Sequence, residues 1–266
     1  MPAHVAADTV TVPFNDKKAV TQAIRRHGKE LACVLVEPVL ANVGVIAPEE
    51  GFLKFLREVT VREKIHLIFD EVITGFRLTY GGAQKIYRVK PDLTILGKVI
   101  GGGFPVGAYG GSRKLMRHVA PAGPVYQAGT LAGHPVAMAA GLATLKVLRQ
   151  KGIYHRLEKT GRDLAKNLLT LSRKAGIPVA VHQVGSLLTL FFTRTQVRNA
   201  ADARVADSRR YARYFRGMLE RGVYLPPSAY EGWFLSTTHG EQEIEATLKA
   251  HDETLQSLTG SRRFRG

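Results

Sequence analysis

The chain has 266 residues, 45% of them hydrophobic, which is enough to bury a sizeable core in one large or two moderate domains. It carries 38 Lys and Arg against 22 Asp and Glu, a net charge of +16 that attracts anionic partners, although the basic residues come singly except in the tail at residues 261–266. The single cysteine, Cys33, excludes an internal disulfide and a cysteine-based metal site and fits a reducing, cytoplasmic compartment.

The first predicted elements are a helix and a strand. Asn15 and Asp16 cap the helix, which ends at Gly28. Residues 31–36 are an apolar run that predicts a strand buried on both faces, with Cys33 as a small core residue. Residues 1–12 lack the basic start and the apolar core of a signal peptide, so export is not expected.

The pattern then continues as helix, strand, strand. Residues 48–63 predict a helix with an apolar stripe, and the short apolar runs at residues 66–69 and 93–96 predict strands that each end at an ionisable side chain. A further strand is expected at residues 105–109. This order is typical of a mostly parallel sheet with crossover helices.

The middle of the chain is rich in small and apolar residues. Ser112 caps a predicted short helix, and residues 133–150, full of Ala, Gly and Met, predict a long buried helix. Prolines and polar residues interrupt the uncharged stretch at residues 119–145, so we expect no membrane span.

The last part of the chain is more charged and predicts a second, α+β unit. Its expected elements are helices at residues 152–175, 207–221 and 241–258 and strands at residues 179–181, 187–192 and around Trp233. The change of character falls at residues 149–152. We therefore predict a parallel-sheet domain over residues 1–150, a smaller α+β domain over residues 151–258 and a basic tail over residues 259–266.

The strongest indication of chemistry comes from residues 67–111, where Asp70 and Lys98 follow two neighbouring strands. Ligands of parallel sheets bind beyond the carboxyl ends of the strands, and both side chains are expected to be buried there. A desolvated lysine amine is available as a nucleophile toward an aldehyde, which is how a lysine holds pyridoxal phosphate. A buried aspartate complements it by keeping a pyridine nitrogen protonated, so that the ring accepts electrons.

The spacing of these residues is also compatible with different roles. Lys98 is alternatively a phosphate-binding lysine, although no Ser or Thr follows it, or a surface lysine beside a loop. Asp70 is alternatively a helix cap or part of a core ion pair. Its neighbour Glu71 points the opposite way on an extended backbone and is expected to be structural. The pair Gly129 and Thr130 offers an amide and a hydroxyl to a phosphate, or else caps a helix.

Metal and nucleic-acid sites are not expected. The histidines show no metal-ligand spacing. Arginines and aromatic residues interleave on the helix at residues 207–221, which is a pattern that binds nucleic acid in some proteins. We favour solvated arginines above a buried aromatic face.

Long segments of the chain match one known family. The most specific of them are VEPV at residues 36–39, IFDEVITGFR at 68–77, PDLTILGKVIGGGFPVGAYGG at 91–111, APAGPVYQAGTLAGHP at 120–135 and GVYLPPSAYEGWFLSTTH at 222–239. On these motifs the chain resembles the glutamate-1-semialdehyde 2,1-aminomutases, which are class III aminotransferases of fold type I that depend on pyridoxal phosphate and serve tetrapyrrole (porphyrin) biosynthesis. The PSAYE segment favours this family over other class III aminotransferases.

The resemblance implies roles for individual residues. It makes Lys98 the Schiff-base lysine and proton shuttle, Asp70 the partner of the pyridine nitrogen, and Val72 a residue that packs on the ring. It places Asn42 near the cofactor hydroxyl and Glu231 near the substrate. The implied reaction moves an amino group within the substrate, from glutamate 1-semialdehyde to 5-aminolevulinate, with the cofactor alternating between its pyridoxal and pyridoxamine forms. The residues implied to reach the phosphate of the neighbouring subunit in a homodimer are Gly129 and Thr130, with Tyr126 close by.

The family also has a long N-terminal region ahead of the segment that matches Pro13, and the chain does not match that region. The resemblance therefore implies an incomplete sheet, in which residues 1–150 are the C-terminal part of the cofactor-binding large domain. Open sheet edges predict poor solubility unless an N-terminal chain or a second copy covers them. Two further functions stay open: another class III aminotransferase, and a non-catalytic fragment with affinity for anions or nucleic acid.

Overall fold

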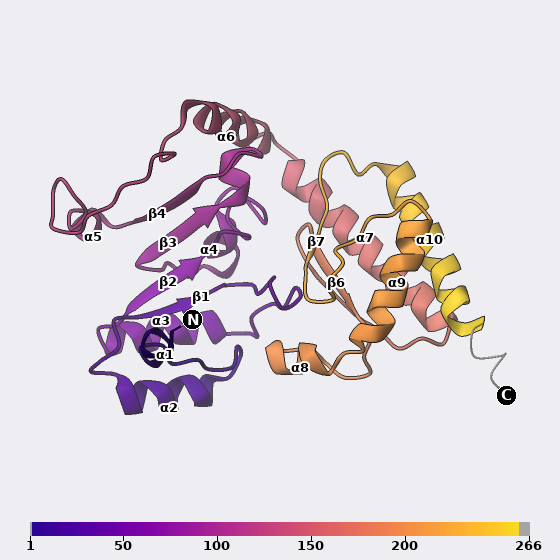
Figure 1. Cartoon of the computed structure of the whole chain (residues 1–266), viewed down its shortest axis with the longest axis horizontal. Coiled ribbons are helices and arrows are strands. Elements are labelled where there is room, and N and C mark those ends of the chain that lie inside the picture. Colours follow the sequence, from indigo (N-terminus) through magenta and orange to yellow (C-terminus); the bar gives the residue numbers. More distant parts are fainter. Residues whose placement is uncertain (1, 261–266) are drawn as a thin grey trace.

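The computed structural model describes residues 2–260, and in it the chain forms two β-sheets side by side (Figure 1). The first sheet has the strand order β1-β2-β3-β4, and the second has the order β5-β6-β7. β1 (Cys33–Val36), β2 (His66–Asp70) and β3 (Leu93–Gly97) run parallel, whereas β4 (Gly107–Gly111) pairs antiparallel with β3. The predicted mostly parallel α/β sheet is confirmed, and its last strand begins later than expected.

Two helices cover one face of the first sheet. α2 (Lys17–His27) is capped by Asp16, whose side chain accepts a hydrogen bond from the Ala19 N–H at 2.8 Å. α3 (Phe52–Arg62) buries its apolar stripe against β2, as its periodicity predicted. The short helices α1 (Ala3–Ala7) and α4 (Gly82–Tyr87) were not predicted, because neither is long enough to show a helical period.

β1 is an edge strand, and the expectation that it is buried on both faces is wrong. Leu35 is 58% exposed, whereas Leu67 in the neighbouring strand β2 is fully buried. Cys33 is half-buried and does not belong to the core. No strand among residues 2–260 pairs with the outer edge of β1. An apolar run specifies a strand, but its burial depends on neighbours that the run does not contain.

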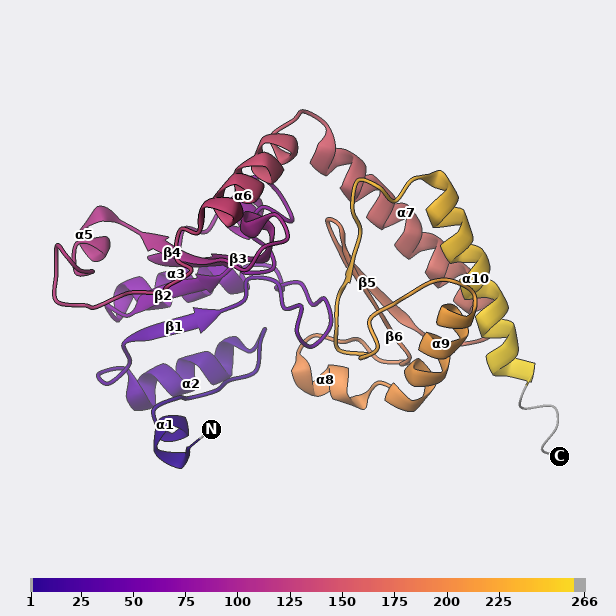
Figure 2. The same ribbon diagram turned by 45° about the horizontal axis from the view of Figure 1, so that its top comes forward.

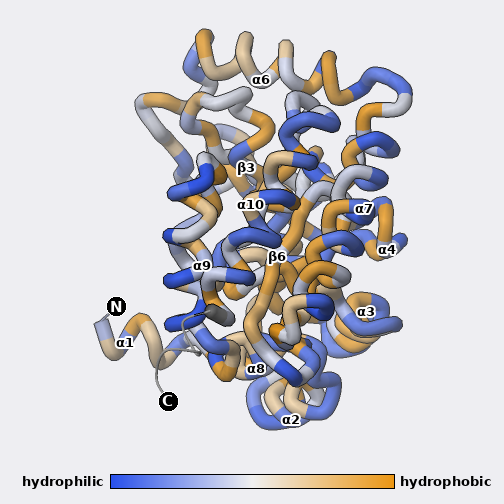
Figure 3. Tube along the Cα trace, turned by 90° about the vertical axis from the view of Figure 1, so that its right-hand side faces the viewer, coloured by the Kyte–Doolittle hydropathy of each residue, from blue (hydrophilic) through white to orange (hydrophobic). Residues whose placement is uncertain are grey.

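The other edge of the sheet leads into a helix that lies unexpectedly on the surface. After α5 (Arg113–Met116), which Ser112 caps, the chain forms α6 (Pro135–Leu148). We expected α6 to be buried, but only Ala137 and Gly141 are, and Leu142 is 58% exposed. Figure 3 shows the trace of α6 mainly in orange and paler tones, so apolar residues outnumber hydrophilic ones along it. A helix with the composition of a core element thus has too few neighbours within the described residues to cover it.

The second sheet carries its helices on one face. α7 (Ile153–Lys174) packs on β5 (Ala180–Val184) and β6 (Leu187–Phe191), and α10 (Glu241–Gly260) lies against α7 and α9 (Ser208–Glu220) (Figure 2). β7 (Trp233–Phe234) completes the sheet, and α8 (Ala200–Val205) precedes α9.

The core beneath these helices is dense, and the aromatic face of α9 belongs to it. Tyr211 and Tyr214 are 2% and 0% exposed, so the predicted burial of the aromatic face is confirmed. No helix among residues 2–260 combines the length and the hydropathy needed to cross a membrane. The basic residues of the predicted tail, at 261–266, lie outside the described residues.

Candidate functional site

Three charged side chains gather at the carboxyl ends of the parallel strands. Glu37 follows β1, Asp70 ends β2 and Lys98 follows β3. The registers of the two parallel pairs bring these ends to the same edge of the sheet. Burial is the main cause that raises the pKa of the Glu37 carboxyl; Asp70 adds to the rise through charge repulsion and Lys98 opposes it through attraction, so all three groups share one electrostatic environment.

Lys98 itself starts the short 3-10 helix η1 (Lys98–Gly101) with a φ of 46°, in the left-handed region that costs a non-glycine residue about 1–2 kcal/mol. Its side chain is exposed, so the expectation of a buried amine is wrong for this chain. Val72 lies against Gly97, the residue before Lys98, because a Cβ atom on Gly97 would be 3.3 Å from the Val72 Cγ1 atom. Glycine at this position leaves room for Val72 next to the lysine.

The two neighbouring carboxylates of Asp70 and Glu71 have different surroundings. Asp70 is half-buried, and its Oδ1 atom accepts a hydrogen bond from the Val72 N–H at 3.0 Å. Glu71 is 1% exposed and accepts hydrogen bonds from the Thr74 hydroxyl at 2.8 Å and the Ala83 N–H at 2.6 Å. The structural role predicted for Glu71 is confirmed, and Asp70 is the carboxylate that faces the strand ends.

Glu37 is a charged residue at this edge that the sequence patterns did not single out. Its Oε1 atom accepts a hydrogen bond from the Asn42 side-chain amide at 3.0 Å, and its Oε2 atom accepts one from the Ala41 N–H at 3.2 Å. Burial is the largest influence on this carboxyl and raises its pKa. Its position in the sequence could have identified it, because Glu37 directly follows a predicted strand, as Asp70 and Lys98 do.

The loop that carries Asn42 also contacts the second sheet. The Gly44 N–H donates to the Tyr230 carbonyl at 2.6 Å, and the Val45 N–H donates to the Thr189 hydroxyl at 3.0 Å. Tyr230 directly precedes Glu231, whose side chain is exposed. The loop therefore links the end of β1 to the segment that holds the predicted substrate residue.

A second link joins the two sheets behind Asp70. Arg77, in the loop after β2, donates to the Leu235 carbonyl at 2.8 Å and lies over the Phe234 ring at 5.4 Å. Burial lowers the pKa of its guanidinium. These contacts attach β7 to the loop that begins at the Asp70 carboxylate.

The predicted phosphate residues lie apart from this edge. Gly129, Thr130 and Tyr126 belong to the extended segment between α5 and α6, and all are exposed, Tyr126 by 83%. No hydrogen bond among residues 2–260 joins them to Lys98 or Asp70. The chain thus assembles Asp70, Val72 and Lys98 with Asn42 nearby, but it does not bring Gly129 and Thr130 to them.

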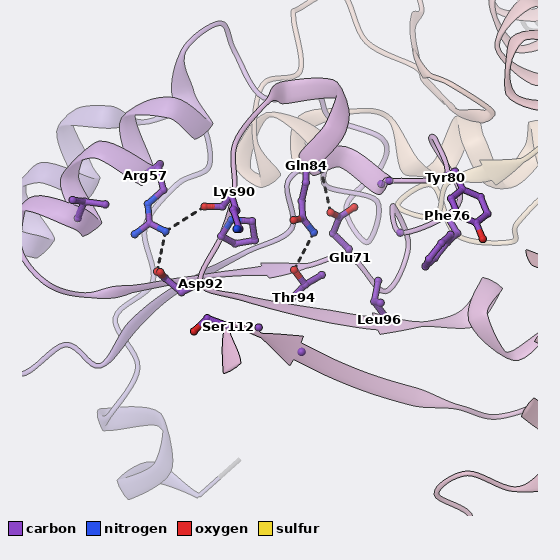
Figure 4. Close-up of a pocket in the computed structure, with 17 residues that line it drawn as sticks. Arg57, Glu71, Phe76, Tyr80, Gln84, Lys90, Asp92, Thr94, Leu96 and Ser112 are labelled. Atoms are coloured by element: carbon purple, nitrogen blue, oxygen red, sulfur yellow. Dashed lines mark hydrogen bonds and ion pairs between the residues drawn. The ribbon is translucent and has the colours of Figure 1, made fainter. Parts of the chain in front are cut away.

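A cavity of about 740 Å³ lies away from the strand ends. Figure 4 shows it over Thr94 and Leu96 of β3, between Arg57 and Asp92 at one end and Phe76 and Tyr80 at the other. Neither Asp70 nor Lys98 lines it. The cavity lies on the face of the sheet near the edge strand β4. Since it holds neither Asp70 nor Lys98, it is not the candidate catalytic site.

The chain belongs to the class-III aminotransferase family, because the model of that family matches residues 2–231. Among its relatives are enzymes named glutamate-1-semialdehyde 2,1-aminomutase. The one from Syntrophus aciditrophicus is 55% identical over 98% of this chain, and the one from Sulfurihydrogenibium sp. is 49% identical over 97%. The chain spans only 61% and 60% of their lengths.

Solved structures support the same assignment. An omega-transaminase from Sphaerobacter thermophilus matches with a TM-score of 0.89 and 36% identity, covering 96% of this chain and 58% of that one. A glutamate-1-semialdehyde aminomutase from Pseudomonas aeruginosa matches with a TM-score of 0.82 and 28% identity over 93% of this chain and 56% of its own. A further match, with a TM-score of 0.87 and 29% identity over 98% of this chain and 60% of its own, is described as a transaminase with PLP bound. The predicted fold is therefore confirmed as that of the class III aminotransferases.

The residues at the strand ends fit the ring of pyridoxal phosphate. Asp70 keeps its second oxygen, Oδ2, without a hydrogen-bond partner among the described residues. A carboxylate, an exposed primary amine and a side-chain amide are the groups that a pyridine nitrogen, an aldehyde and a phenolic oxygen require. Val72, whose N–H donates to the Asp70 carboxylate and whose side chain lies against Gly97, supplies an apolar surface. The fit is to the ring end of the cofactor.

Proposed function

We propose that the chain takes part in the reaction of a glutamate-1-semialdehyde 2,1-aminomutase, which converts glutamate 1-semialdehyde to 5-aminolevulinate for tetrapyrrole synthesis. The observation that carries the proposal is the placement of Asp70 and Lys98 at one sheet edge in a chain that is 55% identical to an enzyme of that name. Because the chain spans about three-fifths of such relatives, the activity belongs to a more complete assembly.

In this proposal pyridoxal phosphate, when bound, supplies an aldehyde that combines with amines and a ring that accepts electrons. Lys98 holds the cofactor through its Nζ atom and then moves protons from the same atom. The Asp70 carboxylate retains a proton on the ring nitrogen, and Val72 packs on the ring. Asn42 orients the cofactor hydroxyl, and Glu231 contacts the substrate.

The phosphate contacts and the partner form a second part of the proposal. Gly129 and Thr130, with Tyr126, reach the phosphate held by a neighbouring subunit of a homodimer. Their exposure supports a role outside this chain's own strand-end site. The open edges of β1 and β4 and the exposed apolar side of α6 support a partner, either a second copy or an N-terminal chain.

The Lys98 assignment is tested by adding pyridoxal phosphate to the protein and recording the visible absorption band that appears when a lysine amine condenses with the aldehyde. The band should form in the unchanged chain and be lost in Lys98→Ala. Lys90→Ala, which removes an exposed lysine from the loop before β3 that lines the cavity away from the strand ends, should keep it. An unchanged band in Lys98→Ala would contradict the assignment.

A second class III aminotransferase activity is the main rival, and the omega-transaminase match supports it. Turnover of an ordinary amino acid and keto acid, without isomerisation of the semialdehyde, would favour this rival. We also propose that the chain divides near residues 149–152 into the two predicted domains, each with its own sheet, and that the protein is cytoplasmic, which its single cysteine supports.

A further inference from the structure

Glu37 stands out because nothing in the proposed reaction uses it, although it shares the edge with Asp70 and Lys98. It is the first residue after β1, and Pro38 follows it. Both of its carboxylate oxygens accept hydrogen bonds, at 3.0 Å from the Asn42 side chain and at 3.2 Å from the Ala41 N–H. One side chain therefore fixes both the main chain and the side chain of the loop at residues 41–42.

The two hydrogen bonds are the local restraints on Asn42. Its side chain is exposed and makes no other hydrogen bond among residues 2–260. An exposed amide of this kind samples several rotamers unless a partner selects one. The Glu37 carboxylate selects one rotamer and leaves the second amide hydrogen and the carbonyl oxygen of Asn42 free for a ligand.

The rest of the loop is held from the other side. Leu40 and Ile46 pair through two hydrogen bonds of 3.0 Å each, and the Gly44 N–H donates to the carbonyl of Tyr230, in the loop before β7. Gly44 has a φ of 86°, and a Cβ atom there would overlap the Phe191 ring, so the loop lies tightly against β6. Asn42 therefore lies between two fixed points: the Glu37 carboxylate on one side and the segment at Gly44, held against β6, on the other.

We propose that Glu37 is a positioning residue, whose carboxylate sets the Asn42 amide beside Asp70 and Lys98 for contact with the cofactor ring. The identity of the ligand, pyridoxal phosphate, rests on the proposed function. The hydrogen bonds from the loop to Glu37 do not depend on any ligand. They can be measured without cofactor.

The charge of Glu37 matters for this role. As an ionised carboxylate it accepts from both N–H groups, whereas protonation turns one oxygen into a donor that opposes one of them. Burial and the charge of Asp70 raise its pKa, while the two hydrogen bonds and Lys98 lower it. Asp70 and Lys98 are the charged groups of the described residues that act on it. Because the two hydrogen bonds lower this pKa, they favour the ionised carboxylate, and a proton taken up by Glu37 while it stays at the sheet edge opposes them. The loop should therefore loosen as Glu37 takes up a proton.

The first test measures hydrogen exchange of the Ala41 amide in the protein without cofactor. Glu37→Gln keeps the shape but removes the charge and one acceptor, and it should speed this exchange about tenfold, the effect of one net hydrogen bond. The exchange rates of the Leu40 and Ile46 amides, which hydrogen-bond to each other's carbonyls, should change less than about twofold. Glu50→Gln is the matched control, because its carboxylate is exposed and forms no ion pair among residues 2–260.

The second test uses pH and the cofactor. After correction for intrinsic exchange, the protection of Ala41 should fall at acid pH in the unchanged chain and stay flat in Glu37→Gln, because only a titrating carboxylate makes this hold depend on pH. The dissociation constant for pyridoxal phosphate, read from the Lys98-dependent band, should rise about tenfold in Glu37→Gln and not in Glu50→Gln.

The outcomes separate the two proposals. Unchanged Ala41 exchange in Glu37→Gln overturns the inference, and so does faster exchange with an unchanged dissociation constant in a chain that binds the cofactor. If the unchanged chain forms no Lys98-dependent band, the proposed function has failed. The exchange and its pH profile then decide by themselves whether Glu37 holds the loop.

Discussion

The buried imidazole of His251 makes a pH-dependent contribution to stability that can be calculated. His251 is 0% exposed and joins three helices: its Nδ1 atom lies 2.8 Å from the Tyr214 hydroxyl, and its Nε2 atom lies 3.2 Å from both the Ser172 hydroxyl and the Leu168 carbonyl. A carbonyl only accepts, so Nε2 carries the hydrogen and Nδ1 accepts from Tyr214. The neutral ring is therefore fully bonded.

Protonation of Nδ1 would place a second donor against the Tyr214 hydroxyl, inside a buried core. Burial accordingly lowers the pKa of His251 from 6.5 to about 4. Because the folded pKa is the lower one, the unfolded chain binds the proton first, and stability is complete above pH 6.5 and falls as the pH drops toward 4. The loss from this residue is about 2 kcal/mol at pH 5 and about 3 kcal/mol at pH 4.

The assay is urea unfolding at pH 7, 6, 5 and 4, followed by the fluorescence of Trp233, the single tryptophan, which is 5% exposed in the same core. His251→Gln keeps polar atoms at the site but cannot titrate. Its overall stability will be lower, but its loss between pH 7 and pH 4 should be about 3 kcal/mol smaller than that of the unchanged chain. Parallel pH curves for the two proteins would refute the reasoning.

Three further predictions concern the loops and the exposed helix. Gly44→Ala should lower the free energy of unfolding by about 3 kcal/mol or more in the same urea assay, because it combines a strained φ with an overlap on the Phe191 ring; a loss below about 1 kcal/mol would contradict this. Glu71→Gln should cost about 2–3 kcal/mol, since an amide nitrogen then faces buried N–H donors; an unchanged midpoint would speak against it. Leu142→Lys on α6 should slow aggregation measured by light scattering, whereas Leu219→Lys on α9, which is 45% exposed, should change it little. Equal effects of the two lysines would show that α6 is not the surface that associates.

The sequence by itself determined the order of the elements and the positions of the strand ends. Short apolar runs specify strands through contacts along the chain, and caps such as Asp16 and Asp207 mark helix starts through bonds to residues three positions away. These are local signals, so β2, β3 and α7 were predicted close to their observed bounds, whereas α3 begins later than the predicted start at residue 48. Asp70 and Lys98 were found for the same reason, because each stands beside a strand end.

Only the tertiary structure decided burial and partnership. Leu35, α6 and Lys98 are more exposed than their sequences suggest, because burial requires neighbours from other parts of the fold. Glu37 could not be assigned a partner from its own segment, since the fold of the loop selects Asn42 and the sheet register selects Asp70. The pattern of apolar residues lies within one segment of the sequence. The contacts that bury a side chain or pair its charge form only when segments distant in the sequence meet.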